Sequence, residues 1–194
     1  RLLAAAEVIG RVVEVGYAVR EFVAQTLKSH PDRVETIFVN LHPSELRADL
    51  LIEACEPLLT VASRIVLEVT ERASLGNSSK LQDDLRLIRE QGYRLAVDDL
   101  GEGYSGLNSL VSLLPDFVKI DMCLIQGVHR APMKQDIIGA IVAMAKRSGI
   151  TVIAEGIECI EERDTLQKLG VDLFQGFLFS KPKKAFPDVH NPDS

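Results

Sequence analysis

The sequence predicts an α/β fold in which parallel strands curl into a barrel covered by helices. Three observations lead to this prediction: strand-like and helix-like segments alternate, the strands are continuously apolar, and nearly every strand ends in a polar side chain. Continuously apolar strands are typical of a parallel sheet with both faces covered. An open sheet gathers polar groups at one switch point, so polar groups at nearly every strand end favour a barrel.

Hydrophobic periodicity and end signals place the elements in order. Apolar residues at helical spacing predict a first helix over residues 2–27. Ser79 and Gln82 form a capping-box pattern for another helix, which ends at Gln91-Gly92. We expect strands at residues 34–41, 64–70, 93–98, 117–121, 150–154 and 171–174, and further helices at residues 43–59, 107–114, 135–148 and 160–169.

The strand count predicts a barrel that is truncated at its N-terminal side. A closed barrel of this type has eight strands and typically about 250 residues, whereas six strands are predicted here. The chain also begins at Arg1 rather than at Met, and its first residues already follow a helical rhythm. We therefore expect a piece of a longer protein that lacks its first two strands.

Composition restricts the class of protein. With 194 residues and 46% hydrophobic side chains, the chain is long enough for one globular domain. A net charge of −6 argues against a duplex nucleic-acid surface but leaves room for a local basic site for a small phosphorylated ligand. No apolar stretch reaches about 18 residues and the first residues lack a signal-peptide pattern, so we expect no membrane span in this segment, although a membrane-attached parent stays open.

Cysteine usage favours a cytoplasmic location. Cys55, Cys123 and Cys159 are odd in number, widely separated and form no CxxC pair. A disulfide framework or a thiolate zinc site is therefore not expected.

The polar strand ends form a set of oxygen ligands. Any one of them has an ordinary structural explanation, since a strand-end Asp can cap the next helix and an Asn can shape a turn. Six in register favour a metal site, and because the four histidines fall into no HExxH or similar spacing, Mg²⁺ or Mn²⁺ is predicted rather than zinc. The set is Asn40, Glu68, Asp98, Asp99, Asp121 and Glu155.

Adjacent carboxylates at Asp98 and Asp99 are the sharper signal. Successive strand residues point to opposite faces, so only an irregular strand end lets both side chains reach one site. Two metal ions about 3.5–4 Å apart, sharing carboxylates, stabilise the attacking and leaving oxygens of an in-line phosphoryl displacement. The implied reaction is phosphodiester hydrolysis.

Lys119 lies two residues before Asp121 and so faces the same side of a strand. It could lose a proton and act on a nucleophilic water, stay charged and hold a phosphate, or neutralise the acidic rim as a structural ion pair. The sequence leaves these three roles open.

A glycine-rich loop follows the paired aspartates. Gly101 and Gly103 permit unusual backbone angles and close approach to a ligand, which indicates an active-site loop rather than a simple turn. Glu71, three residues after Glu68, could hold this loop or be the first-turn acid of a helix.

Six ordered motifs resemble the EAL-domain family of bacterial cyclic di-GMP phosphodiesterases. They are Val39-Asn40, Glu68-Val-Thr-Glu71, Asp98-Asp99-Leu-Gly-Glu-Gly-Tyr104-Ser105, Lys119-Ile-Asp121, Ala154-Glu155-Gly-Ile-Glu158 and Gln175-Gly176-Phe177. The resemblance assigns residues 1–182 to a modified TIM (β/α)8 barrel domain and leaves residues 183–194 as a C-terminal tail. It implies hydrolysis of cyclic di-GMP to linear pGpG with Mg²⁺ or Mn²⁺, inhibition by Ca²⁺, a homodimer, and an attached upstream sensor or GGDEF-type domain in a bacterial signalling protein.

The resemblance also implies a role for each matching residue. The six oxygen-bearing strand ends match metal-site positions, and Lys119 and Glu155 match catalytic positions. Supporting, loop or substrate positions are matched by Glu71, Gly101, Gly103, Tyr104, Ser105, Glu158 and Gln175.

Three departures from the family pattern matter. The Glu-Ala-Leu signature, whose glutamate is a metal ligand on the first strand, is absent from this chain. Leu100, Glu102 and Gly106 stand where the family loop usually has Phe, Thr and Ser, so Glu102 adds negative charge beside the site. Cys159 stands where Thr is common, with no evident consequence.

Three functions compete. The first is a phosphodiesterase domain, impaired as an isolated piece. The second is a module that binds cyclic di-GMP without cutting it, favoured if the upstream strand carries no acidic ligand. The third is a barrel enzyme of the enolase type with Lys119 as its base, which the paired Asp and the glycine-rich loop fit poorly.

Overall fold

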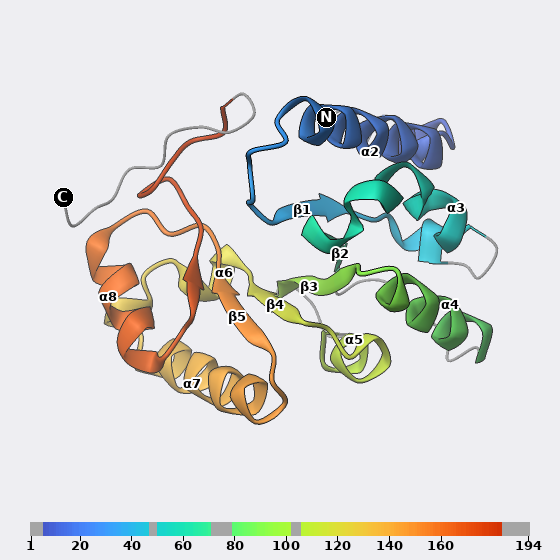
Figure 1. The fold of residues 1–194 in the computed structure, drawn as a ribbon. Coiled ribbons are helices and arrows are strands. Elements are labelled where there is room, and N and C mark those ends of the chain that lie inside the picture. Colours follow the sequence, from blue (N-terminus) through green and yellow to red (C-terminus); the bar gives the residue numbers. More distant parts are fainter. Residues whose placement is uncertain (1–5, 47–49, 71–78, 102–105, 184–194) are drawn as a thin grey trace.

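A computed structural model describes residues 6–46, 50–70, 79–101 and 106–183 (Figure 1). One sheet holds six parallel strands, each paired with the next along the chain. They are β1 (Ile37–Asn40), β2 (Ile65–Thr70), β3 (Arg94–Leu100), β4 (Phe117–Ile120), β5 (Thr151–Ala154) and β6 (Leu173–Phe174). Within the described residues β1 and β6 each pair with one strand only, so the sheet is open.

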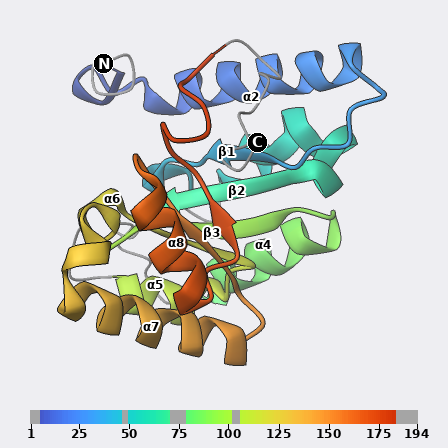
Figure 2. The same ribbon diagram turned by 90° about the vertical axis from the view of Figure 1, so that its left-hand side faces the viewer.

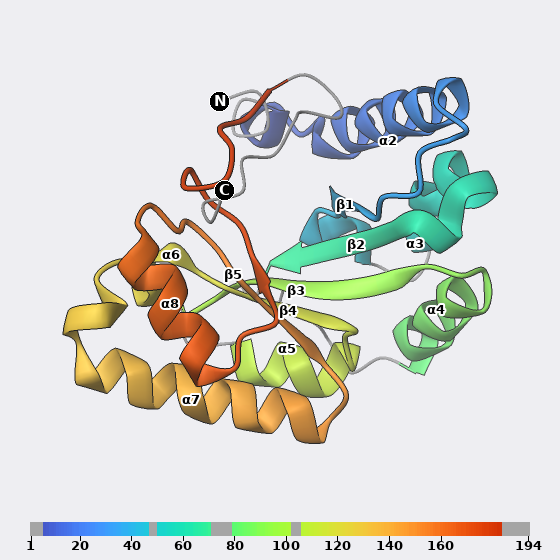
Figure 3. The same cartoon turned by 60° about the vertical axis from the view of Figure 1, so that its left-hand side comes forward.

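Helices follow one another around the outside of the curled sheet. They are α2 (Val12–Ser29), α3 (Leu51–Cys55), α4 (Ser79–Glu90), α5 (Gly106–Leu113), α6 (Met122–Ile125), α7 (Pro132–Arg147) and α8 (Ile160–Leu169), with the 3-10 helices η1 (Pro43–Leu46), η2 (Glu56–Arg64) and η3 (Val128–Arg130). Figure 3 shows α3, α4, α5, α7 and α8 placed in turn around the strands. Figure 2 shows α2 apart from them, above β1 and β2. The predicted fold class, an α/β barrel truncated at its N-terminal side, is confirmed, since the parallel sheet curls into a half-barrel (Figure 3).

The first predicted helix is wrong as one element. Gly10 has φ +69°, and the Arg11 N–H donates to the Ala6 carbonyl (2.8 Å) while the Gly10 N–H donates to that of Glu7 (3.1 Å). These two bonds form a Schellman motif, which ends one helix before α2 begins.

The predicted helix at residues 43–59 is also wrong as one element. Its described parts are η1, α3 and η2, separated by residues 47–49 outside the described ranges and by a change of helix type after Cys55. Pro57 stands in the first turn of η2, at the change of helix type. The short elements α6 and η3 were not predicted, and α7 begins at Pro132, three residues before the predicted start.

The two faces of the sheet bury different side chains. One face packs against the helices and forms the main core, with Leu67, Val97, Val118, Ile120 and Val152 all buried. The opposite face carries a smaller apolar cluster of Val66, Ala96, Phe117 and Ile153, on which Phe38 packs. We call this second face the inner face, and its strand-end part carries the polar residues described next.

No helix in the described part of the chain is both long and apolar enough to cross a bilayer.

Candidate active site

Alternation along the strands puts the predicted site residues on the inner face. Side chains two residues apart share a face, so Glu68 follows Val66, Lys119 follows Phe117 and Glu155 follows Ile153. Strand pairing carries the same face across the sheet, since Phe38 is opposite Val66 and Asn40 is opposite Glu68. Residues far apart in sequence therefore lie close together on the inner face, next to the apolar cluster and nearer the C-terminal ends of the strands.

A β-bulge brings both adjacent aspartates to this face. The pairing of β3 with β4 runs from Val97 opposite Val118 to Leu100 opposite Ile120, so two residues of β3 stand against one residue of β4. Val97 and Leu100 both belong to the helix-facing core; the residues between them, Asp98 and Asp99, are thus both left for the inner side. Asp99 has φ +58°, a left-handed conformation that supports the bulge. The predicted irregular strand end is confirmed.

Three carboxylates surround the Lys119 ammonium. Its Nζ atom lies 2.6 Å from Glu68 Oε1, 3.0 Å from Asp98 Oδ1 and 2.6 Å from Glu155 Oε1. The Lys119 side chain is only 6% exposed, so these contacts lie in a poorly solvated environment. Carboxylate oxygens of Asp98, Asp99 and Glu155 lie within 4.8 Å of one another, close enough to share one cation. Carboxyl groups thus outnumber the ammonium.

The pKa values show the cost of this crowding. Burial raises the pKa of Glu155 to about 7, with Asp98 and Glu68 adding repulsion and Lys119 opposing the rise. Burial likewise raises the pKa of Glu68. Burial alone would lower the pKa of Lys119, but Glu68, Asp98 and Glu155 outweigh it and raise the pKa above its usual value. Lys119 is therefore an ammonium at neutral pH, and the carboxylates lack a full complement of positive charge.

A pocket of about 330 Å³ opens beside this cluster. It is lined by Asp99, Asp121, Met122, Glu155, Gly156, Glu158, Gln175, Gly176 and Phe177. Asp121 also caps α6, since its Oδ1 accepts the Cys123 N–H at 2.8 Å. The capping explanation and the site explanation thus apply to the same residue.

The other predicted residues differ in how closely they join the cluster. Asn40 ends β1 with an exposed side chain, opposite Glu68 in register but outside the Lys119 ion pairs described above. Glu158 and Gln175 are exposed at the pocket edge. Gly101 has φ +112°, and a Cβ there would meet Leu124 Cδ1 at 2.5 Å, so this position requires glycine. Glu71, Gly103, Tyr104 and Ser105, with Glu102, lie outside the described residues.

The sequence analysis did not predict that Gly156 and Gly176 form part of the pocket wall through close backbone contacts. A Cβ at Gly156 would meet Met122 Cβ at 2.5 Å, and one at Gly176 would meet the Ile157 carbonyl oxygen at 2.2 Å. These glycines let α6 and the segment after β6 close against the loop after β5. Phe177, a residue that is 58% exposed, then lies at the pocket. The sequence signal that could have indicated this wall is Gly176 directly before Phe177.

The sequence matches the family described as EAL domain over residues 1–182. Among curated relatives, the cyclic di-GMP phosphodiesterase RocR of Pseudomonas aeruginosa is 34% identical over 155 residues, which cover 78% of this chain and 39% of that protein. The chain thus spans about two-fifths of the length of this relative.

Solved structures agree with this match. A complex of Klebsiella pneumoniae BlrP1 with manganese and cyclic di-GMP has a TM-score of 0.79 and 33% identity, covering 88% of this chain and 45% of that one. PaMucR phosphodiesterase in complex with cyclic di-GMP has a TM-score of 0.82 and 29% identity, covering 94% of this chain and 77% of that one.

Proposed function

This chain belongs to the EAL domain family, and on that basis we propose that it hydrolyses cyclic di-GMP to linear pGpG with the help of divalent metal ions. One observation carries the proposal: Glu68, Asp98 and Glu155, from three different strands, converge on Lys119 beside a pocket. The relatives that bind or hydrolyse cyclic di-GMP support the choice of substrate.

The residues fit hard divalent cations. Every candidate ligand offers oxygen, which is the donor that Mg²⁺ and Mn²⁺ prefer. The carboxyl groups exceed the one ammonium among them, which supports the binding of a further positive charge there. We propose that Glu68, Asp98, Asp99, Asp121 and Glu155 hold the ions, with Asn40 and Gln175 at the edge. When bound, two such ions supply Lewis-acid stabilisation of phosphate oxygens and an activated water.

Lys119 has a narrower role in this proposal than the sequence allowed. Without bound metal ions, Glu68, Asp98 and Glu155 raise the pKa of Lys119, so its side chain is an ammonium at neutral pH. Its ammonium holds Glu68, Asp98 and Glu155 in position and is a hydrogen-bond donor for a phosphate oxygen or a water. The three ion pairs therefore support a positioning and charge-stabilising role.

The pocket offers contacts for a nucleotide. The exposed Phe177 ring provides a surface on which a base can stack, next to the carboxylates that would hold the metal ions. Glu158 and Gln175 add polar groups at the same edge. A dimer, an upstream sensor or GGDEF-type domain and a cytoplasmic location stay predictions.

The test is turnover by the intact protein that carries this chain, incubated with cyclic di-GMP and Mn²⁺ or Mg²⁺, with pGpG followed by chromatography. We expect product in the wild type and a loss of about 10²–10³-fold or more in Glu155→Gln, because a ligand and a charge are removed without changing shape. Glu90→Gln, the same change on an exposed residue of α4, is the control and should retain activity.

Two other outcomes discriminate among the functions. Tight binding of cyclic di-GMP without turnover, unchanged in Glu155→Gln, would replace the hydrolase with the receptor. Absence of both binding and turnover would remove both and leave the enolase-type alternative.

A further inference from the structure

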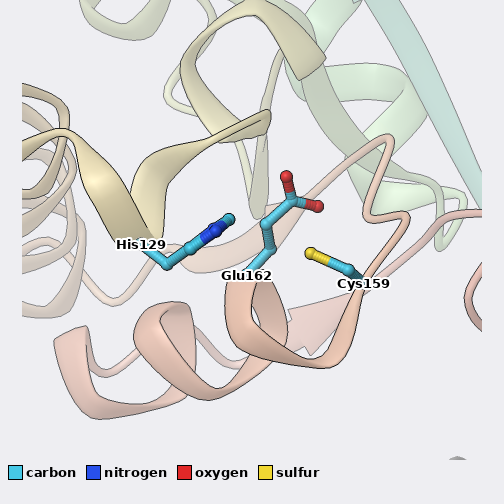
Figure 4. A group of neighbouring side chains, drawn as sticks. All are labelled: His129, Cys159 and Glu162. Carbon is cyan, nitrogen blue, oxygen red and sulfur yellow. The ribbon is translucent and has the colours of Figure 1, made fainter.

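A second group of metal-ligating side chains lies outside the pocket. His129 comes from η3, Cys159 directly precedes α8, and Glu162 belongs to the first turn of α8. Figure 4 shows the three side chains gathered around one space, although His129 is some thirty positions away in sequence. One ligand atom from each lies within 4.8 Å of the others. None of the three lines the pocket described above.

Glu162 is held in place by the backbone. Its Oε1 accepts the Gly127 N–H at 2.8 Å and its Oε2 accepts the Glu158 N–H at 3.1 Å. Burial acts to raise the pKa of Glu162, but these N–H donors outweigh it and keep the pKa low, so the carboxylate is charged. The residue is only 5% exposed. A fixed, charged and buried oxygen ligand is thus already in position.

His129 has an unexplained polar atom. Its Nδ1 is buried and makes no hydrogen bond within the described residues. Buried polar atoms are normally paired, and one without a partner calls for a water, an ion or another explanation. Gly127, with φ +72°, makes the left-handed turn from which η3 starts and so presents His129 to α8.

We propose that His129, Cys159 and Glu162 bind a Zn²⁺ ion, with water in the fourth position. A thiolate, an imidazole and a carboxylate are the ligand types that zinc accepts, whereas Mg²⁺ and Mn²⁺ prefer oxygen alone. Tetrahedral ligands at bond lengths of about 2.0–2.3 Å lie about 3.3–3.8 Å apart, so closure around the ion needs a movement of roughly 1 Å. On binding, the Cys159 thiol releases its proton to solvent and the sulfur forms the metal bond.

This site differs from the thiolate site that cysteine spacing excluded, because it uses one cysteine, a glutamate three residues later, and a histidine that only the fold brings near. It would also affect the pocket. Cys159 follows Glu158 directly, and Glu158 lines the pocket and donates its N–H to Glu162. A bound ion would therefore fix one pocket wall to η3. That effect on turnover rests on the proposed function, whereas zinc binding itself does not.

Cobalt is the probe, because Co²⁺ bound to a thiolate gives a charge-transfer absorption that oxygen ligands do not produce. The intact protein is titrated with Co²⁺ in excess Mg²⁺, which occupies oxygen-only ligands. We expect a thiolate band that saturates at about one Co²⁺ per chain and disappears when Zn²⁺ is added. Cys159→Ser should abolish the band, and His129→Ala should weaken Co²⁺ affinity about tenfold or more.

Two controls locate the signal. Cys123→Ser removes an exposed cysteine on α6, outside the group, and should keep the band. Asp98→Asn alters the proposed catalytic cluster and should also keep it. The proposal is overturned if the wild type gives no band, if the band survives in Cys159→Ser, or if it is lost in Cys123→Ser or Asp98→Asn. The band does not depend on cyclic di-GMP hydrolysis, so failure here and failure of the hydrolase proposal are separate results.

Discussion

Two buried groups of charged side chains differ in their balance of positive and negative charge. Between α2 and η1, Arg20 faces Glu45 with both side chains at most 1% exposed. Nη2 lies 2.5 Å from Oε1 and Nη1 lies 3.4 Å from Oε2, while the His42 N–H also donates to Glu45. Gly16 leaves room for this pair, since a Cβ there would lie 3.1 Å from Arg20 Nη1. One cation meets one anion, and both are hydrogen-bonded.

The strand-end cluster is the opposite case. Around Lys119, three carboxylates share one ammonium, and burial raises the pKa of two of them, Glu68 and Glu155. The first group is balanced in charge within the protein, whereas the second carries more carboxylates than cations and borders a pocket. A buried ion pair is by itself weak support for function. Unbalanced charge beside a pocket is the feature that separates a candidate site from a structural contact.

The largest stability effect is expected in the balanced pair. Glu45→Leu leaves the Arg20 guanidinium buried without its partner and should lower the free energy of unfolding by about 3–5 kcal/mol. Urea denaturation of the metal-free protein measures this. The double variant Arg20→Met/Glu45→Leu removes both charges and should recover most of the loss. If it is as unstable as the single variant, charge pairing is not what stabilises this contact.

Lys119→Met should destabilise the metal-free protein by about 2–3 kcal/mol, because Glu68, Asp98 and Glu155 lose the cation that offsets their repulsion. Millimolar Mg²⁺ or Mn²⁺ should restore stability, since a divalent ion replaces the missing charge. The matched variant Arg20→Met should show no such restoration. Thermal unfolding with and without metal measures both responses. If metal stabilises both variants equally, the Lys119 cluster and the Arg20–Glu45 pair do not differ in their need for a further cation.

Glu155→Gln should stabilise the metal-free protein while lowering turnover. Folding raises the pKa of Glu155 to about 7, so its favourable contribution is present below its unfolded value and is lost as pH rises through 7. The shift corresponds to at most about 3 kcal/mol, which partial exposure reduces to about 1–2 kcal/mol. Unfolding in urea with a chelator should therefore favour the variant at pH 8 and show little difference below pH 4.5. If the wild type is more stable than Glu155→Gln at pH 8, Glu155 instead stabilises the fold through its ion pair with Lys119.

The local sequence pattern was sufficient to predict the ends of helices that have strong termination signals. Helix α8 has the predicted bounds, and Gly92 and Gly149 mark turns where predicted helices end. Prediction failed where one residue changed the backbone locally: Gly10 split the first helix, and Pro57 coincides with the change to 3-10 geometry in η2. These failures come from backbone conformations that hydrophobic periodicity does not encode.

The sequence by itself determined that oxygen-bearing side chains follow buried strands, because side-chain type and strand alternation are local properties. The adjacent aspartates Asp98 and Asp99 predicted an irregular strand end. The sequence did not show that this irregularity is a bulge in the pairing of β3 with β4. Only the tertiary structure decided that Lys119 sits among three carboxylates, that Arg20 meets Glu45, and that His129 reaches Cys159. Such contacts join separate elements, and the curl and register of the sheet set which of them meet. The charge balance that distinguishes a site from a structural pair exists only once those distances are fixed.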